Sequence, residues 1–151
     1  MEKLTCDSCG QEIKNVQDGW VEWISFAERD KTGQGLRLVH KNSRNNSLCQ
    51  YDQRAEYDKH GGILSDNALE QFIGPDGLMR LLVMISENEL SKAEVLEMIK
   101  RLHIPGYDQA KDYFDEAICN GYFEPNMPPR FYWQSDIAAT MKYKKSIEGD
   151  A

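Results

Sequence analysis

Two cysteines near the start of the chain have the spacing of a metal-binding turn. The stretch TCDSCGQ, from Thr5 to Gln11, contains Cys6 and Cys9, and Gly10 follows directly after the second cysteine. A glycine at this position is typical of a tight metal-binding turn. Such a turn lets two thiolates reach one ion while backbone N–H groups point at the sulfurs. Structural zinc takes four cysteine or histidine ligands in a tetrahedron. This stretch therefore predicts half of a structural zinc site.

The other half of the site is expected from the same part of the chain. His40 ends a predicted strand, and Cys49 follows the polar loop after that strand. We predict a site with three cysteines and one histidine, formed by Cys6, Cys9, His40 and Cys49. His60 and Asp52 remain alternatives for the fourth ligand.

Two other interpretations of the cysteine pair stay open. A redox pair normally lies where a strand meets a helix in a βαβ unit, whereas Cys6 and Cys9 precede a predicted strand. The two thiols can also be unpaired and adjacent by chance. A catalytic zinc keeps one coordination position for water, so a site with only three protein ligands would point to a zinc or thiol enzyme.

The sequence contains none of the common catalytic motifs. It has no Gly-rich phosphate loop, no Gly-x-Ser-x-Gly elbow and no His-Glu-x-x-His. We therefore expect a binding or regulatory protein that acts through protein contacts, not an enzyme.

A basic cluster in the first half suggests a second possible contact. It surrounds a polar, asparagine-rich loop between two predicted metal ligands, and a zinc-ordered loop of this kind can contact nucleic acid. The plain alternative is a solvated loop. The cluster consists of Arg37, Lys41, Arg44 and Arg54.

The elements expected to position these residues divide near Gly62. Residues 19–26 and 36–40 alternate apolar and polar side chains, which predicts an antiparallel hairpin. Helical periodicity dominates afterwards, with helices expected at about 65–73, 76–87, 91–102, 107–119 and 131–145. We predict an α+β protein with a zinc-stapled β-hairpin module at 1–62 and an acidic helical module at 63–151.

The segment from Leu78 to Pro125 resembles winged helix-turn-helix domains. LMRLLVMISENELSKAEVLEMIKRLHIPGYDQAKDYFDEAICNGYFEP has the order helix, turn, capped helix, turn, helix, then a glycine before an aromatic extended piece. The resemblance implies a three-helix core with a wing, and it suggests a DNA-binding transcriptional regulator. A small helical bundle is the alternative.

The charge of the second half opposes DNA contact. Residues 63–151 carry 9 basic and 15 acidic residues, net −6, whereas residues 1–62 carry 9 and 10, net −1. DNA-reading helices present basic or amide side chains to phosphates and bases. The helix expected at 107–119 is the third of the segment that resembles a winged helix-turn-helix domain. It instead offers a possible protein interface, formed by Asp108, Asp112, Asp115 and Glu116.

Length and composition fit a small protein of the cytoplasm. The chain has 151 residues and a formal charge of −7, with no apolar run of about 20 residues that would span a bilayer. Its start lacks the apolar region of a signal peptide. A cytoplasmic setting keeps thiols reduced, which favours metal binding over disulfides. We expect protein partners, nucleic acid only through the N-terminal loop, and no membrane partner.

Overall fold

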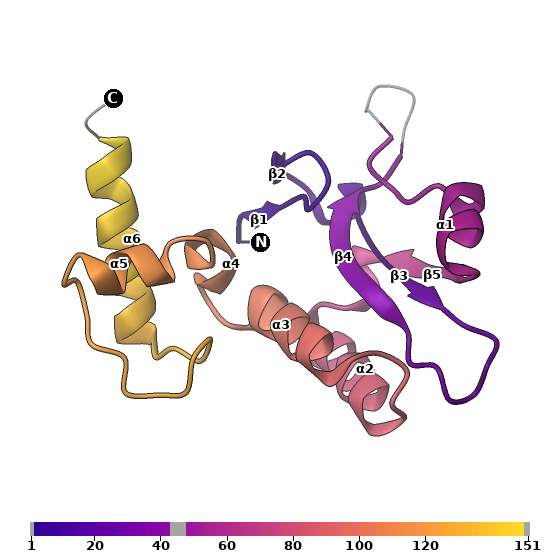
Figure 1. Cartoon of the computed structure of the whole chain (residues 1–151). Coiled ribbons are helices and arrows are strands. Elements are labelled where there is room, and N and C mark those ends of the chain that lie inside the picture. The colour runs from indigo at the N-terminus through magenta and orange to yellow at the C-terminus, as the bar shows by residue number, and fades with distance from the viewer. Residues whose placement is uncertain (1, 43–47, 150–151) are drawn as a thin grey trace. The chain divides into compact units, whose positions relative to one another are not determined.

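The computed structural model describes residues 2–42 and 48–149 and has an α+β fold. The chain divides into two compact units, one of residues 3–103 and one from Ile104 onward. Figure 1 shows the sheets in the first unit and three helices in the second. No helix in the described part of the chain is both long and apolar enough to span a bilayer.

The first unit is built on a three-stranded antiparallel sheet. Its strands β3 (Gly19–Ser25), β4 (Gln34–His40) and β5 (Ile63–Ala68) lie in the order β4-β3-β5. Val21 is paired with Leu38 on one side and with Asn67 on the other. The hairpin expected from residues 19–26 and 36–40 is therefore present as β3 and β4. A separate two-stranded sheet joins β1 (Leu4–Thr5) to β2 (Glu12–Ile13).

Three helices complete the first unit, together with two short 3-10 turns, η1 (Val16–Asp18) and η2 (Leu69–Gln71). The helices are α1 (Gln53–His60), α2 (Gly74–Ser86) and α3 (Lys92–His103). One core holds residues from both sheets and from α2 and α3. Its members include Val21, Leu38, Leu81 and Val95, none of which is exposed.

The predicted helix at 65–73 is wrong, because this segment forms β5 and η2. Six consecutive residues, from Ile63 to Ala68, are paired with β3. The hydroxyls of Ser25 and Ser65 lie 2.6 Å apart, so Ser65 contacts β3 and does not cap a helix. A helix of eight residues is marginal alone, whereas here β3 supplies a partner along the whole strand.

The position of β5 also explains why the first unit does not end at residue 62. Strands from both sides of Gly62 form one sheet, and α2 and α3 pack into the same core as β3 and β4. The structure thus divides after His103, whereas the sequence suggested modules of 1–62 and 63–151. Residues 63–103 belong with the strands because they bury the apolar face of the sheet.

The second unit is a small helical cluster with an aromatic core. Its helices are α4 (Tyr107–Ala110), α5 (Phe114–Cys119) and α6 (Gln134–Glu148). The rings of Phe114 and Tyr132 are stacked with centroids 3.9 Å apart, and Tyr107 lies 5.5 Å from Phe114. The single helix expected at 107–119 is therefore split into two, with both halves directing an aromatic residue into this core.

The winged-helix resemblance does not extend to this arrangement. Helices α2 and α3 contribute to the core of the first unit, whereas α4 and α5 pack with α6 in the second. Residues 120–133, all of which the structure describes, form no strand that could start a wing. The resemblance is limited to the order of helices along the sequence, because these helices do not share one three-helix core.

Candidate metal centre

Four potential metal ligands converge in the first unit. The ligand atoms of Cys6, Cys9, His40 and Cys49 all lie within 4.8 Å of one another. The first two come from the turn between β1 and β2, His40 from the end of β4, and Cys49 from the segment before α1. These are the four residues that the sequence predicted as ligands. Their coordination of a metal remains a prediction.

The turn that carries Cys6 and Cys9 is fixed by its backbone. Leu4 is paired with Ile13, and the N–H of Cys6 donates to the carbonyl of Gln11 at 2.9 Å. The chain reverses at Gly10, which has φ of +75° and donates its N–H to the carbonyl of Cys6. Left-handed backbone is readily adopted by glycine. Gly10 therefore closes the turn and keeps both thiols on one side.

The spacing of the ligand atoms is close to that of a tetrahedral zinc site. Bonds of about 2.3 Å to sulfur and about 2.0 Å to nitrogen separate neighbouring ligand atoms by about 3.5–3.8 Å. The Sγ of Cys9 lies 3.4 Å from Nδ1 of His40. A zinc ion would thus need only small side-chain adjustments to be enclosed.

The tautomer of a neutral His40 ring is set by its second nitrogen. Nε2 lies 3.1 Å from the carbonyl oxygen of Glu12. A carbonyl only accepts hydrogen bonds, so Nε2 carries a proton, and in the neutral ring Nδ1 then keeps its lone pair. Metal-bound histidines generally donate their other N–H to a carbonyl or carboxylate, which orients the ring. His40 therefore has the tautomer that a metal ligand at Nδ1 needs.

The two thiols of the turn differ electrostatically. Burial raises the pKa of Cys6, but N–H groups of Cys9, His40 and Ser8 outweigh this effect and lower the pKa to about 7. The N–H of His40 lies 3.3 Å from this sulfur, and that of Cys9 lies 3.5 Å away. The pKa of Cys9 is raised by partial burial and by the neighbouring Cys6. The site thus readily supplies one thiolate, and a cation would favour ionisation of the second.

A buried ion pair holds the segment that contains Cys49. Glu22 is fully buried on β3 and accepts from Nε of Arg37 at 2.7 Å and from the N–H of Tyr51. Nη2 of Arg37 donates to the carbonyl of Cys49 at 2.9 Å. The sequence analysis missed this role of Glu22. The available signal was a carboxylate within an apolar strand, at a position facing a basic residue of the next strand.

A second ion pair supports the turn from the other side. Asp7, between the two cysteines, accepts from the N–H of Leu38 at 2.8 Å and from Nη1 of Arg101 at 2.7 Å. Arg101 lies on α3 and also donates to the carbonyl of Thr5. Sequence reasoning did not identify Arg101, because 94 residues separate it from Asp7 and no local pattern connects them.

The two alternative fourth ligands have other roles. Asp52 caps α1 by accepting from the N–H of Ala55 at 2.9 Å. His60 lies at the far end of the same helix, 3.5 Å from the carboxylate of Glu56. The described residues that cluster as possible ligands therefore include His40 and neither alternative.

Of the basic residues predicted to contact nucleic acid, Arg37 is held inside the first unit. The guanidinium of Arg37 pairs with Glu22 and lies 3.6 Å from the centre of the Tyr51 ring, so it is committed inside the unit. Lys41 lies over the Trp20 ring, and Arg54 is exposed on α1. Arg44 lies outside the described residues.

One of the four residues predicted to form an acidic interface, Asp108, is not accessible. Asp108 is buried, with 4% of its surface exposed, so it does not belong to an accessible face. Asp112, Asp115 and Glu116 are exposed on or beside α5. The carboxylate of Glu116 accepts from the hydroxyl of Tyr143 at 2.9 Å.

Comparisons of this chain with models of known protein families, with curated proteins and with solved structures find no match.

Proposed function

We propose that the first unit holds one structural zinc ion and that the protein is a binding or regulatory protein acting through protein contacts. The observation that carries the zinc proposal is the convergence of four ligand atoms within 4.8 Å. The ligands are Cys6, Cys9, His40 and Cys49. Three sulfurs and one imidazole form a donor set that suits zinc better than calcium or magnesium, which prefer oxygen.

The surroundings of the four ligands favour a structural role over a catalytic one. Cys6 and Cys49 are buried members of the main core. Four protein ligands fill a tetrahedron and leave no position for a reacting water. The backbone donors at Cys6 and the acceptor at His40 resemble the outer shell that orients ligands around structural metals.

Metal analysis of the purified full-length protein tests the zinc proposal. We expect one zinc per chain in the wild type and loss of zinc in Cys9→Ser. Cys119→Ser is the matched control, because Cys119 is an exposed thiol outside the cluster and its loss should leave zinc unchanged. Wild-type protein that neither copurifies with zinc nor binds added zinc would contradict the proposal.

Thermal melting separates the structural role from the catalytic one. Structural zinc contributes directly to folding, so Cys9→Ser should melt at a lower temperature than Cys119→Ser. A Cys9→Ser protein that melts like the wild type but has lost a measurable reaction would support the enzyme alternative instead.

Exposed surface supports the proposed protein contacts. Met79, Leu82 and Val83 are exposed on α2, with 61%, 46% and 47% of their surfaces accessible. Adjacent exposed apolar side chains often mark contact sites. On the second unit, Asp112 and Asp115 supply exposed negative charge.

Crosslinking in a lysate of the host tests this part of the proposal. A reproducible set of partners should be crosslinked to the wild type. If the acidic face is used, Asp112→Lys combined with Asp115→Lys should reduce the yield of those partners. Wild-type protein that yields no partner above the background of an unrelated acidic protein would count against a binding function.

A further inference from the structure

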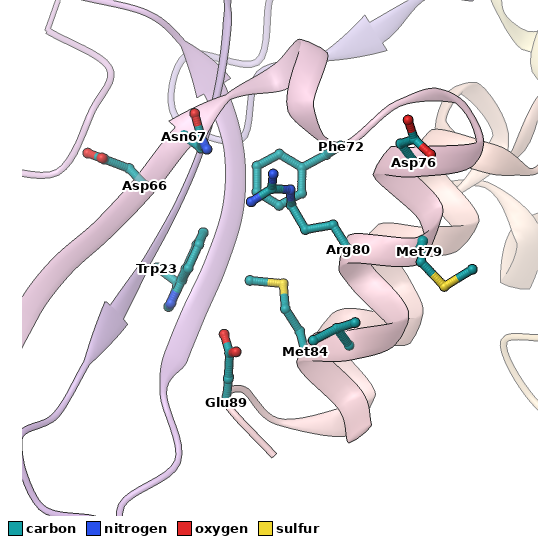
Figure 2. Close-up of a pocket in the computed structure, with 10 residues that line it drawn as sticks. Trp23, Asp66, Asn67, Phe72, Asp76, Met79, Arg80, Met84 and Glu89 are labelled. Atoms are coloured by element: carbon teal, nitrogen blue, oxygen red, sulfur yellow. The ribbon is translucent and has the colours of Figure 1, made fainter. Parts of the chain in front are cut away.

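A groove of about 490 Å³ lies on the first unit, between the sheet and α2. Its volume falls within the range of about 300–1,000 Å³ that is typical of ligand sites. Figure 2 shows Trp23 on the sheet side, Met84 directed toward it from α2, and Phe72 at the end where the chain enters the helix. None of the residues that line it belongs to the four-ligand cluster.

The floor of the groove is apolar. The rings of Trp23 and Phe72 meet edge to face, at 88° and with centroids 6.3 Å apart, which creates an aromatic corner. Phe72 and Met84 are buried, whereas Met79 and Val83 remain largely exposed at the α2 side. Apolar side chains from a partner can therefore extend the core outward at this place.

The rim of the groove is acidic. Two carboxylates line it, those of Asp76 and Glu89, and Arg80 is the one cation among the described residues of its lining. Asp66 also borders the groove, but it is paired with Glu22 across the sheet, so its carboxylate points to the face opposite Trp23, as Figure 2 shows. Arg80 is already engaged, since its guanidinium lies 5.8 Å from the Phe72 ring and Nη2 is 3.4 Å from the amide oxygen of Gln71. Within residues 2–42 and 48–149, the carboxylates of Asp76 and Glu89 make no ion pair. Their unbalanced charge favours a cationic ligand.

The shape of the site suits an extended chain. Asp66 and Asn67 belong to β5, which has a strand neighbour only on its β3 side. The side chain of Gln53 covers the start of this edge by accepting from the N–H of Leu64 at 2.8 Å. The exposed residue Asp66 lies beyond that cover. A strand edge beside an apolar groove is a common site for extended peptides.

We propose that the groove between β3, β5 and α2 binds an extended peptide segment of a partner protein, with apolar side chains flanked by lysine or arginine. The apolar side chains lie against Trp23, Met79 and Val83. The cations lie near Asp76 and Glu89, and long basic side chains can rest their methylene groups on the aromatic corner. This inference rests on the proposed binding function and gives it a partner class.

Fluorescence anisotropy with a labelled dodecapeptide of alternating lysine and leucine tests the inference on the full-length protein. We expect saturable binding that weakens as salt rises from about 50 to about 300 mM. A peptide with glutamate in place of lysine should not bind. A peptide with serine in place of leucine should bind at least about tenfold more weakly, because the apolar contacts are lost.

Variants locate the binding in the groove. Asp76→Asn with Glu89→Gln should raise the dissociation constant about tenfold, whereas Asp58→Asn, which changes an exposed carboxylate on α1, should not change it. Met79→Ser with Val83→Ser should also weaken binding. Arg80→Gln should strengthen binding, because it removes the one cation among the described residues that line the groove. Equal effects of Asp58→Asn and the groove variants would overturn the inference, since binding would then be non-specific.

Two further results would overturn it. The first is that the lysine-leucine peptide does not bind. The second is that the wild type self-associates in sedimentation and that Met79→Ser with Val83→Ser abolishes this self-association, since a second copy of the chain would then occupy the groove. Zinc content is measured in every variant. The wild type can fail to bind the peptide while it still binds zinc and is crosslinked to lysate partners outside the groove. That result would refute this inference and leave the proposed function standing.

Discussion

His40 uses its two ring nitrogens for different purposes. Nε2 donates to the carbonyl of Glu12, while Nδ1 faces the Sγ of Cys9 at 3.4 Å. The first contact joins the end of β4 to β2, and the second directs a lone pair into the cluster. A single residue thus connects the small sheet to the large one and supplies the only nitrogen of the site.

Substitution of His40 should separate ligand chemistry from packing. His40→Ala leaves three cysteines, so we expect the dissociation constant for zinc to rise at least about 100-fold. His40→Cys restores a fourth soft ligand and should bind zinc much more tightly than His40→Ala. Competition with a chromophoric chelator measures both constants. Equal affinities of the wild type and His40→Ala would remove His40 from the ligand set.

Glu22 gives a residue-scale prediction about pH. Burial raises its pKa above the usual 4.5, although Arg37 and the N–H of Tyr51 act in the opposite direction. A raised carboxyl pKa means that folding favours the protonated form. The stability that Glu22 contributes is therefore fully present below about pH 4.5 and falls as pH rises through the folded pKa.

The variant Glu22→Gln tests whether the stability contributed by Glu22 falls as pH rises. The variant should be less stable than the wild type by about 1–2 kcal/mol at pH 7, because the glutamine amide places a donor against Nε of Arg37 or the N–H of Tyr51. Because glutamine does not titrate, the advantage of the wild type should narrow as pH rises from about 4.5 toward neutrality. Urea unfolding of both proteins at matched pH and zinc concentration measures the difference. An advantage that widens with pH would contradict the direction of the shift.

Elements differ in how clearly the sequence specified them. The hairpin of β3 and β4 could be predicted because its strands alternate apolar and polar residues and are joined by a glycine-containing loop. The convergence of the four candidate ligands could be predicted because they lie in a turn, at a strand end and after a loop within one half. Both conclusions depended on local pattern.

The elements that were mispredicted depend on long-range contacts. The segment of β5 has the capping serine and apolar spacing of a helix, and only its pairing with β3, about 40 residues earlier, makes it a strand. Similarly, Asp7 and Arg101 meet across 94 residues. The burial of Asp108 is also decided by tertiary packing, not by the helical periodicity around it.

The start of α2 offers an element-scale prediction. Gly77 lies in the first turn of this helix, and a Cβ added there would come within 2.1 Å of the Phe72 carbonyl carbon. The backbone at Phe72 cannot move away without displacing the Phe72 ring from the core. Gly77→Ala should therefore destabilise the first unit by at least about 2 kcal/mol, despite the higher helix propensity of alanine.

A second glycine supplies the control for Gly77→Ala. Gly61 has φ of +72° and no atom within 4 Å of an added Cβ, and asparagine tolerates this backbone region. Gly61→Asn should thus cost less than about 1 kcal/mol. Thermal or urea unfolding compares the two variants, and a Gly77→Ala protein as stable as the wild type would show that α2 can shift away from Phe72.

At the scale of the whole molecule, charge argues against DNA as the main partner. The chain carries −7, and of the four basic residues predicted to contact nucleic acid, Arg37 is committed to Glu22. Affinity for DNA depends on lysine and arginine releasing counterions from phosphate. We expect no gel shift of duplex DNA by the full chain at about 150 mM salt. Micromolar or tighter binding that is lost in Lys41→Ala with Arg54→Ala would restore the DNA-binding alternative.

The division after His103 predicts how far the effect of metal removal spreads. Cys6 and Cys49 share one core with residues of β3, β4, α2 and α3, whereas α4, α5 and α6 bury a separate aromatic core. Loss of the metal should therefore loosen residues 3–103 as a group and not only the strands that precede Gly62. The second unit has no member in the four-ligand cluster and should keep its helices.

Hydrogen exchange with and without a strong chelator measures this spread. Amides of β3, β4, α2 and α3 should exchange at least about tenfold faster after zinc removal, and the protection of α6 should be unchanged. Zinc added back should restore protection, which excludes a direct effect of the chelator. Cys9→Ser should reproduce the chelated pattern without any chelator, and Cys119→Ser should not. Loss of protection confined to residues before Gly62 would show that α2 and α3 fold independently of the metal, and the first unit would then have to be divided.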